Sequence, residues 1–267
     1  YAYSAALYAS KNHKKKRPDK LLAFAPDFKK YPINKNKVYR NTDSSTNKLL
    51  ELRGARREAQ LFGSYRNASV FLEQDATEGN FKNFAPYSKV IHLATHALID
   101  HRDPMYSKLL FSQNLDSFED GMLHLYEIYE MDINAGLITL SACNTGYNTQ
   151  ANNQGLVTLA HGFAHAGCRN LLMSLWNIPD RQTSHIMQDF YEEMDQGSSI
   201  AQSLHKAKLK YLAKADGQTA SPALWSAMVF VGNYKGMQED SDNIIAYILI
   251  GVGILGAGAW FLKSNFS

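Results

Sequence analysis

Two residues that can form a nucleophilic pair stand where two apolar runs of the sequence end. His96 closes the run "VIHLATH", and Cys143 closes the run "LITLSAC". If both runs are neighbouring strands of a parallel sheet, the two side chains lie at one edge, where such sheets present reactive groups. An imidazole beside a thiol can take its proton, and the resulting thiolate is the attacking species. The pair therefore predicts nucleophilic cysteine chemistry.

The residues around this pair fit the same chemistry but leave other interpretations open. Backbone N–H groups at Ala97 and at Cys143 itself follow the strand ends, where they can stabilise an oxyanion. On spacing alone, Cys143 can equally be a small buried hydrophobe. A third interpretation is a doubly wound ligand-binding domain whose "CNTG" loop binds an anion through its backbone.

The histidine pairs of the chain are poor metal sites. His92 and His96 are four residues apart, which on a strand separates them by about 13 Å and prevents a shared metal. His161 and His165 have the same spacing on a predicted helix, which can bind zinc. No glutamate follows His161 as it does in a hydrolytic zinc helix, so we interpret both as core or polar-face residues. We expect no metal site.

The cysteines argue against two further classes of protein. Two cysteines in 267 residues cannot form a disulfide framework, and a reducing compartment fits them best. A cysteine phosphatase needs an arginine six residues after its cysteine, where this chain has Thr149. Cys168 directly precedes an apolar run, which predicts a structural residue.

Composition and patterning predict the fold class. With 45% hydrophobic and 20% charged residues, the chain can form a globular domain with a large core. Nearly continuous apolar runs alternate with helical stretches, which predicts an α/β fold with one parallel sheet covered on both faces. We expect strands at 21–27, 68–75, 90–97, 137–143, 170–177 and 226–233, and helices at 48–65, 154–167, 183–197 and 199–215.

The ends of the chain differ from this middle part. Residues 244–262 carry no charge and would span roughly 29 Å as a helix, close to the thickness of a bilayer core. Their glycines weaken a soluble helix but suit a membrane helix, so we expect one transmembrane span. Near the other end, the basic run Lys11 to Lys20 is expected to be a solvated loop. The net charge of +3 is too small to indicate nucleic-acid binding.

Several stretches, in this order, are similar to those of one known family. They are "LRGARREAQLF", "ATEGNF", "VIHLATHALID", "YSKLLFS", "DGMLHLYEIYEMDINAGLITLSACNTG", "GLVTLAHGFAHAGCRNLLMSLWNIPDRQT" and "LWSAMVFVGN". The chain from Tyr1 to about Asn233 thus resembles the CHAT domain, a caspase-like peptidase module related to caspases and separase and often found behind tetratricopeptide repeats. The resemblance implies a caspase-like three-layer sandwich with a mostly parallel sheet.

The resemblance also implies an activity. The family's catalytic histidine and cysteine fall on His96 and Cys143, and no metal or organic cofactor is implied. Such enzymes cleave a protein partner, in some cases a gasdermin-like pore former or an effector in bacterial defence. They tend to stay inactive until a sensor module or partner licenses them. Departures from the family pattern are Ala97 in place of glycine, Asn153 to Gly155 in place of Gly-Glu-Gly, and His161 in place of arginine.

Together these patterns predict a membrane-tethered cysteine endopeptidase. Its expected parts are a peptidase domain (1–233), a linker (234–243), a transmembrane helix (244–262) and a short tail (263–267), with the peptidase domain on the cytoplasmic side. Trp176, Asp120 and Asp180 are candidates for the substrate pocket. The regulatory module is expected before Tyr1 or on a partner. The alternative is an inactive pseudopeptidase that serves as a membrane-tethered scaffold.

Overall fold

The structure is a computed structural model. It describes residues 20–28, 52–65, 67–100, 102–113, 118–141, 154–176 and 178–232. Cys143 and the predicted linker, transmembrane helix and tail lie outside these ranges. Among the described residues, no helix is both long and apolar enough to cross a membrane.

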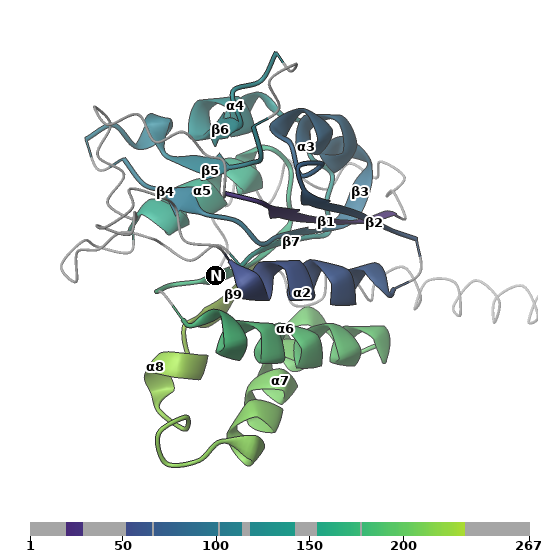
Figure 1. The fold of residues 1–267 in the computed structure, drawn as a ribbon, viewed down its shortest axis with the longest axis vertical. Helices are drawn as coiled ribbons and strands as arrows, with labels where there is room; N and C mark the ends of the chain where they lie inside the picture. The colour runs from purple at the N-terminus through teal and green to yellow at the C-terminus, as the bar shows by residue number, and fades with distance from the viewer. Residues whose placement is uncertain are drawn as a thin grey trace, which may run out of the picture.

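A six-stranded sheet forms the centre of the described part of the chain (Figure 1). Its strand order is β2-β1-β3-β7-β8-β9, and the first five strands in this order are parallel. The bounds are Lys20–Pro26 (β1), Ala68–Glu73 (β2), Ser88–Leu93 (β3), Leu137–Leu140 (β7), Asn170–Ser174 (β8) and Met228–Gly232 (β9). All six predicted strands therefore exist, and most of them end a few residues earlier than predicted.

The last strand corrects the prediction of a single parallel sheet, because β9 runs antiparallel to β8. The reason lies in the connection between these two strands. Two long helices, α6 (Asp180–Asp195) and α7 (Ile200–Lys214), connect β8 to β9. A connection between two parallel strands usually contains one helix. The two helices join through a turn at Gly197, whose φ of 87° favours glycine. The second helix returns the chain to the carboxyl edge of the sheet, so the next strand runs the opposite way.

Helices cover both faces of the sheet, as predicted (Figure 1). One face packs against α2 (Arg53–Gly63), α6 and α7, and the other against α3 (Glu78–Phe84), α4 (Leu125–Glu130) and α5 (Gln154–His165). The side chains of β3 alternate between the two cores: Ile91 and Leu93 point into one, and Val90 into the other. Burial on both faces explains why these strands read as continuous apolar runs.

A second, three-stranded antiparallel sheet was not predicted. It consists of β4 (Ala97–Leu98), β5 (Lys108–Leu110) and β6 (Met122–His124), in that order. Strands of two or three residues are too short to leave an alternating pattern in the sequence. The 3₁₀ turns at Ala85–Tyr87 and Pro104–Tyr106, the helix α3 and the single turn α8 (Pro222–Trp225) were missed as well.

Candidate active site

The strands that lead to His96 and Cys143 are neighbours, as the predicted nucleophilic pair requires. β3 pairs in parallel with β7, with Leu93 opposite Leu140. One residue further along, the backbone N–H of Ser141 donates to the Leu93 carbonyl at 3.0 Å. This hydrogen bond joins the two chain segments at the carboxyl edge of the sheet.

The chain is short between this hydrogen bond and each predicted catalytic residue. His96 follows Leu93 by three residues, and Cys143 follows Ser141 by two. At most about 3.6 Å per residue, these segments reach roughly 11 Å and 7 Å. Cys143 itself lies outside the described residues, so its distance from His96 stays a prediction.

His96 is buried between the large sheet and the small one. Its side chain is 1% exposed, and its ring lies 4.6 Å from the ring of Phe28, which follows β1. The His96 carbonyl accepts a hydrogen bond from Leu110 N at 2.9 Å, and the Thr95 hydroxyl donates to the Leu110 carbonyl. Ala97, the predicted oxyanion residue, begins β4 and pairs with Leu109. The start of the small sheet thus fixes the backbone around His96.

A buried polar network holds β7, the strand that leads to Cys143. We call it the strand-end network; its members are Glu58, His92, Thr139, Ser141 and Tyr191. The Ser141 hydroxyl donates to Glu58 Oε2 at 2.7 Å, and His92 Nε2 lies 3.3 Å from the same oxygen. His92 Nδ1 is 3.0 Å from the Tyr191 hydroxyl, which donates to Thr139 Oγ1 at 3.0 Å. Burial raises the pKa of Tyr191 far above its usual value, so this hydroxyl stays protonated.

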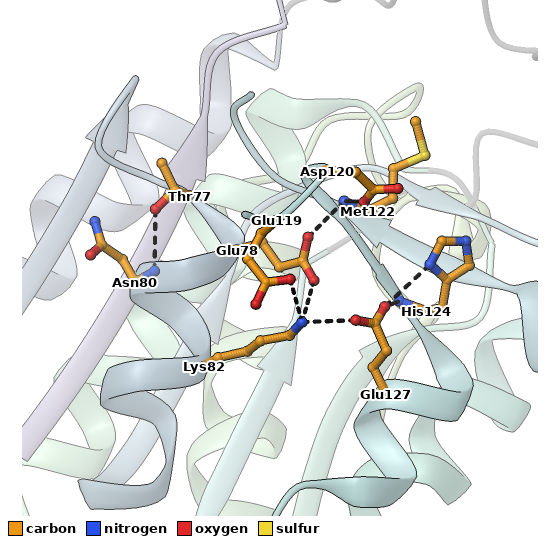
Figure 2. Close-up of polar contacts among 9 residues, drawn as sticks. All are labelled: Thr77, Glu78, Asn80, Lys82, Glu119, Asp120, Met122, His124 and Glu127. Atoms are coloured by element: carbon orange, nitrogen blue, oxygen red, sulfur yellow. Dashed lines mark hydrogen bonds and ion pairs between the residues drawn. The ribbon is translucent and has the colours of Figure 1, made fainter. Parts of the chain in front are cut away.

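A charged cluster lies beside the small sheet (Figure 2). We call it the lysine cluster; its members are Glu78, Lys82, Glu119 and Glu127. The Lys82 ammonium is 2.7 Å from a carboxylate oxygen of each glutamate. The three carboxylates are close enough together to hold a metal ion, but Lys82 already supplies a positive charge between them.

The pKa values of this cluster reflect burial and crowding of charge. Burial, opposed by Lys82, raises the pKa of Glu78 to about 7. For Lys82, burial acts to lower the pKa, but the three surrounding carboxylates outweigh it and raise the pKa. For Glu127, burial acts to raise the pKa, and hydrogen bonds from Lys82 and from the His124 N–H lower it.

The lysine cluster also holds the third strand of the small sheet. Glu78 Oε2 accepts from Met122 N at 3.0 Å, and Glu127 Oε2 accepts from His124 N at 2.8 Å. Since Met122 and His124 are the ends of β6, two carboxylates fix this strand to α3 and α4 (Figure 2). The small sheet that begins next to His96 therefore rests on the cluster.

The candidate pocket residues have separate surroundings. Trp176 follows β8 and is half-buried, and its indole N–H donates to the Ala223 carbonyl at 2.8 Å. Asp120 is exposed in the turn before β6, where its carboxylate accepts from Met122 N at 2.8 Å. Asp180 begins α6, and its side chain is not described. Cavities of 360 Å³ between α2 and α6, and of 540 Å³ bordered by α6 and α7, are lined by other residues. The pocket assignment stays a prediction.

The remaining histidine and cysteine interpretations fit the structure. His161 and His165 are exposed on α5, and the His165 ring packs 4.8 Å from that of Tyr129. His92 belongs to the strand-end network. Cys168 is buried, and its thiol lies 3.1 Å from the Asn170 carbonyl oxygen that accepts its hydrogen bond.

Among the polar residues that sequence reasoning missed are Glu58 and Ser141, which meet in the strand-end network. Glu58 lies within "LRGARREAQLF" and Ser141 within "LITLSAC", but neither was given a role. Two signals were available. A glutamate among the small apolar residues of one helix face, and a serine next to a buried strand, are both groups that need hydrogen-bond partners when buried.

Several solved structures align with this chain at low sequence identity. Gingipain R, an arginine-specific cysteine proteinase, aligns with 10% identity and a TM-score of 0.47 over 81% of this chain and 46% of its own. The complex of the pro- and mature domains of Porphyromonas gingivalis RgpB aligns with 10% identity and a TM-score of 0.50, over 82% and 48%. Separase of Saccharomyces cerevisiae, in complex with securin, aligns with 13% identity and a TM-score of 0.47, over 85% and 13%.

These likenesses concern the fold alone, and the chain spans less than half the length of the gingipain structures. No curated protein matches the chain. The profile of the CHAT domain matches residues 1–233, which include every described strand and helix. The chain therefore belongs to the CHAT domain family.

Proposed function

We propose that this chain is a cysteine endopeptidase that cleaves a protein substrate through His96 and Cys143. The hydrogen bond from Ser141 to Leu93 is the observation that carries the proposal, because it holds both residues' chain segments at one edge of the sheet. Membership of a caspase-like peptidase family supports the same chemistry.

The proposed reaction proceeds through a thioester. The Cys143 thiolate attacks the carbonyl carbon of the scissile peptide bond, and the backbone N–H groups of Ala97 and Cys143 bind the resulting oxyanion. His96 gives a proton to the leaving amine as the C–N bond breaks. Water then hydrolyses the thioester and restores the thiol. No cofactor takes part in these steps.

The burial of His96 favours an enzyme that rests in an inactive state. With 1% of its side chain exposed and Phe28 against its ring, His96 cannot meet a peptide substrate unless its cover moves. We propose that a sensor module or partner protein causes this movement. A transmembrane helix at 244–262 would hold the enzyme near a substrate that acts at the membrane, such as a pore-forming effector.

The decisive experiment measures thiol reactivity in the full chain. Wild type, Cys143→Ala, Cys168→Ala and His96→Ala are treated with an iodoacetamide probe over pH 6–9, and circular dichroism confirms that each is folded. We expect the probe to label wild type and Cys168→Ala but not Cys143→Ala. His96→Ala should be labelled about tenfold more slowly at pH 7, because the thiolate fraction falls.

Proteolysis by the licensed protein is the second readout, and both dyad variants should lose it. Labelling of Cys143 that is slow and independent of His96, together with no proteolysis by the licensed protein, would instead indicate the pseudopeptidase. Labelling confined to Cys168 would exclude the proposed nucleophile.

A further inference from the structure

We infer that Glu58 is a positioning residue for the nucleophile: through Ser141 it fixes the end of β7 from which Cys143 extends. This inference rests on the proposed function, because it concerns how the same site is held. Glu58 lies on α2, 83 residues before Ser141 in sequence.

Ser141 is anchored in two directions. Its backbone N–H is bonded to β3 through Leu93, and its hydroxyl is bonded to α2 through Glu58. The first bond sets the distance from the strand that leads to His96. The second fixes the rotation of the chain about the strand axis, because the side chain must point at the carboxylate. Only Ala142 lies between this anchored residue and Cys143.

Loss of the hydrogen bond between Ser141 and Glu58 is energetically unfavourable. Glu58 is 4% exposed and Ser141 is 8% exposed, so both groups are largely removed from water. A hydrogen bond to a carboxylate at 2.7 Å is charge-assisted and stronger than a neutral one. Breaking it would leave a buried carboxylate short of a donor. We therefore expect the end of β7 to keep one orientation whenever α2 is in place.

The network itself offers a matched control. Thr139 lies on the same strand and the same face as Ser141, two residues earlier, and it bonds the Tyr191 hydroxyl rather than Glu58. A purely structural role of the network would slow labelling of Cys143 in both variants in proportion to the stability that each loses. A positioning role of Glu58 makes only Ser141 important for Cys143.

The test compares Glu58→Gln, Ser141→Ala and Thr139→Val in the full chain. Iodoacetamide labelling over pH 6–9 gives the apparent pKa of the Cys143 thiol, and urea unfolding gives the stability. We expect Ser141→Ala to slow labelling at pH 7 by about fivefold or more and to raise the apparent pKa. Glu58→Gln keeps an oxygen acceptor, so its effect should be intermediate. Thr139→Val should lose less stability than Ser141→Ala, because its bond to Tyr191 is neutral, and it should label within about twofold of wild type.

Hydrogen exchange of the peptide containing residues 139–150 separates this inference from the proposed function. Faster exchange in Ser141→Ala than in Thr139→Val supports positioning by Glu58, even if wild-type labelling proves independent of His96 and the proposed chemistry fails. Equal exchange and equal labelling in the two variants would overturn the inference. If Glu58→Gln does not fold, Ser141→Ala decides alone, since it leaves only a small void and removes the same bond.

Discussion

Two regions of the molecule are held by polar networks of different kinds. One is β7, the strand that leads to Cys143, and the other is the small sheet that follows His96. The strand-end network fixes β7 with hydroxyls, one imidazole and one carboxylate, all buried. The lysine cluster fixes β6 with one ammonium and three carboxylates, and the Lys82 and Glu119 side chains keep 25% and 33% of their surface exposed. Each network connects segments that are far apart in sequence.

This difference between the two networks indicates which side of the site depends on pH and salt. Charges with partial access to water depend on pH and salt, whereas the buried hydrogen bond between the Tyr191 and Thr139 hydroxyls does not. The side that carries His96 should therefore respond more strongly to ionic strength than the side that leads to Cys143.

Replacement of Lys82 should have the largest effect on the free energy of unfolding. Lys82→Met leaves three neighbouring carboxylates without their counter-charge, which we expect to cost about 3 kcal/mol of unfolding free energy. Urea unfolding at pH 7.5 measures the loss. Lys206→Met is the control, because Lys206 is half exposed and pairs with one carboxylate, Glu193. Equal losses in both variants would show that the lysine cluster stabilises the fold no more than a single partly exposed ion pair does.

Tyr191→Phe should have the next largest effect. It removes the hydroxyl that joins His92 to Thr139 and leaves the aromatic packing unchanged, so we expect a loss of about 1–2 kcal/mol. Tyr211→Phe should cost less, because that hydroxyl makes one hydrogen bond, to the partly exposed Thr219 carbonyl. A Tyr191→Phe protein as stable as wild type would mean that the strand-end network contributes little to the fold.

A pH series tests the lysine cluster through one group, Glu78. The pKa of Glu78 is raised from 4.5 to about 7, so its contribution to stability is full below pH 4.5 and is lost as the pH rises through 7. The lowered pKa of Glu127 acts in the opposite sense, and only as the pH falls below 4.5. Stability measured from pH 5 to 8 should therefore decline in wild type and decline less in Glu78→Gln. A slope unchanged by Glu78→Gln would contradict the assignment.

The large sheet was predictable because its strands are buried on both faces. Runs such as Val90 to Leu93 and Leu137 to Leu140 are almost continuously apolar, so each can be recognised as a buried strand from its local sequence alone. The long connection between these two strands permits a parallel crossover, but which strands pair is determined by the fold. The antiparallel direction of β9 could have been predicted, because the two helices expected at 183–197 and 199–215 return the chain to the edge of the sheet where β8 ends.

The two polar networks could not be predicted because each depends on contacts over long sequence separations. Lys82 meets Glu119 and Glu127 across 37 and 45 residues, and Ser141 meets Glu58 across 83. Local patterns indicate that such residues are polar, but only the fold determines which of them meet. Hydrogen-bonding residues in buried elements are therefore the part of a site that sequence reasoning finds last.

The direction of the edge strands has a consequence for how this domain faces its surroundings. β1 begins at Lys20, next to Ser88, and β9 ends at Gly232, next to Asn170; both positions lie at the amino edge of the sheet. His96 lies at the opposite edge, roughly 20 Å away along strands of six or seven residues. A surface or protein that holds the chain through residues beyond 232 would therefore hold it at the edge of the sheet opposite the one that carries His96.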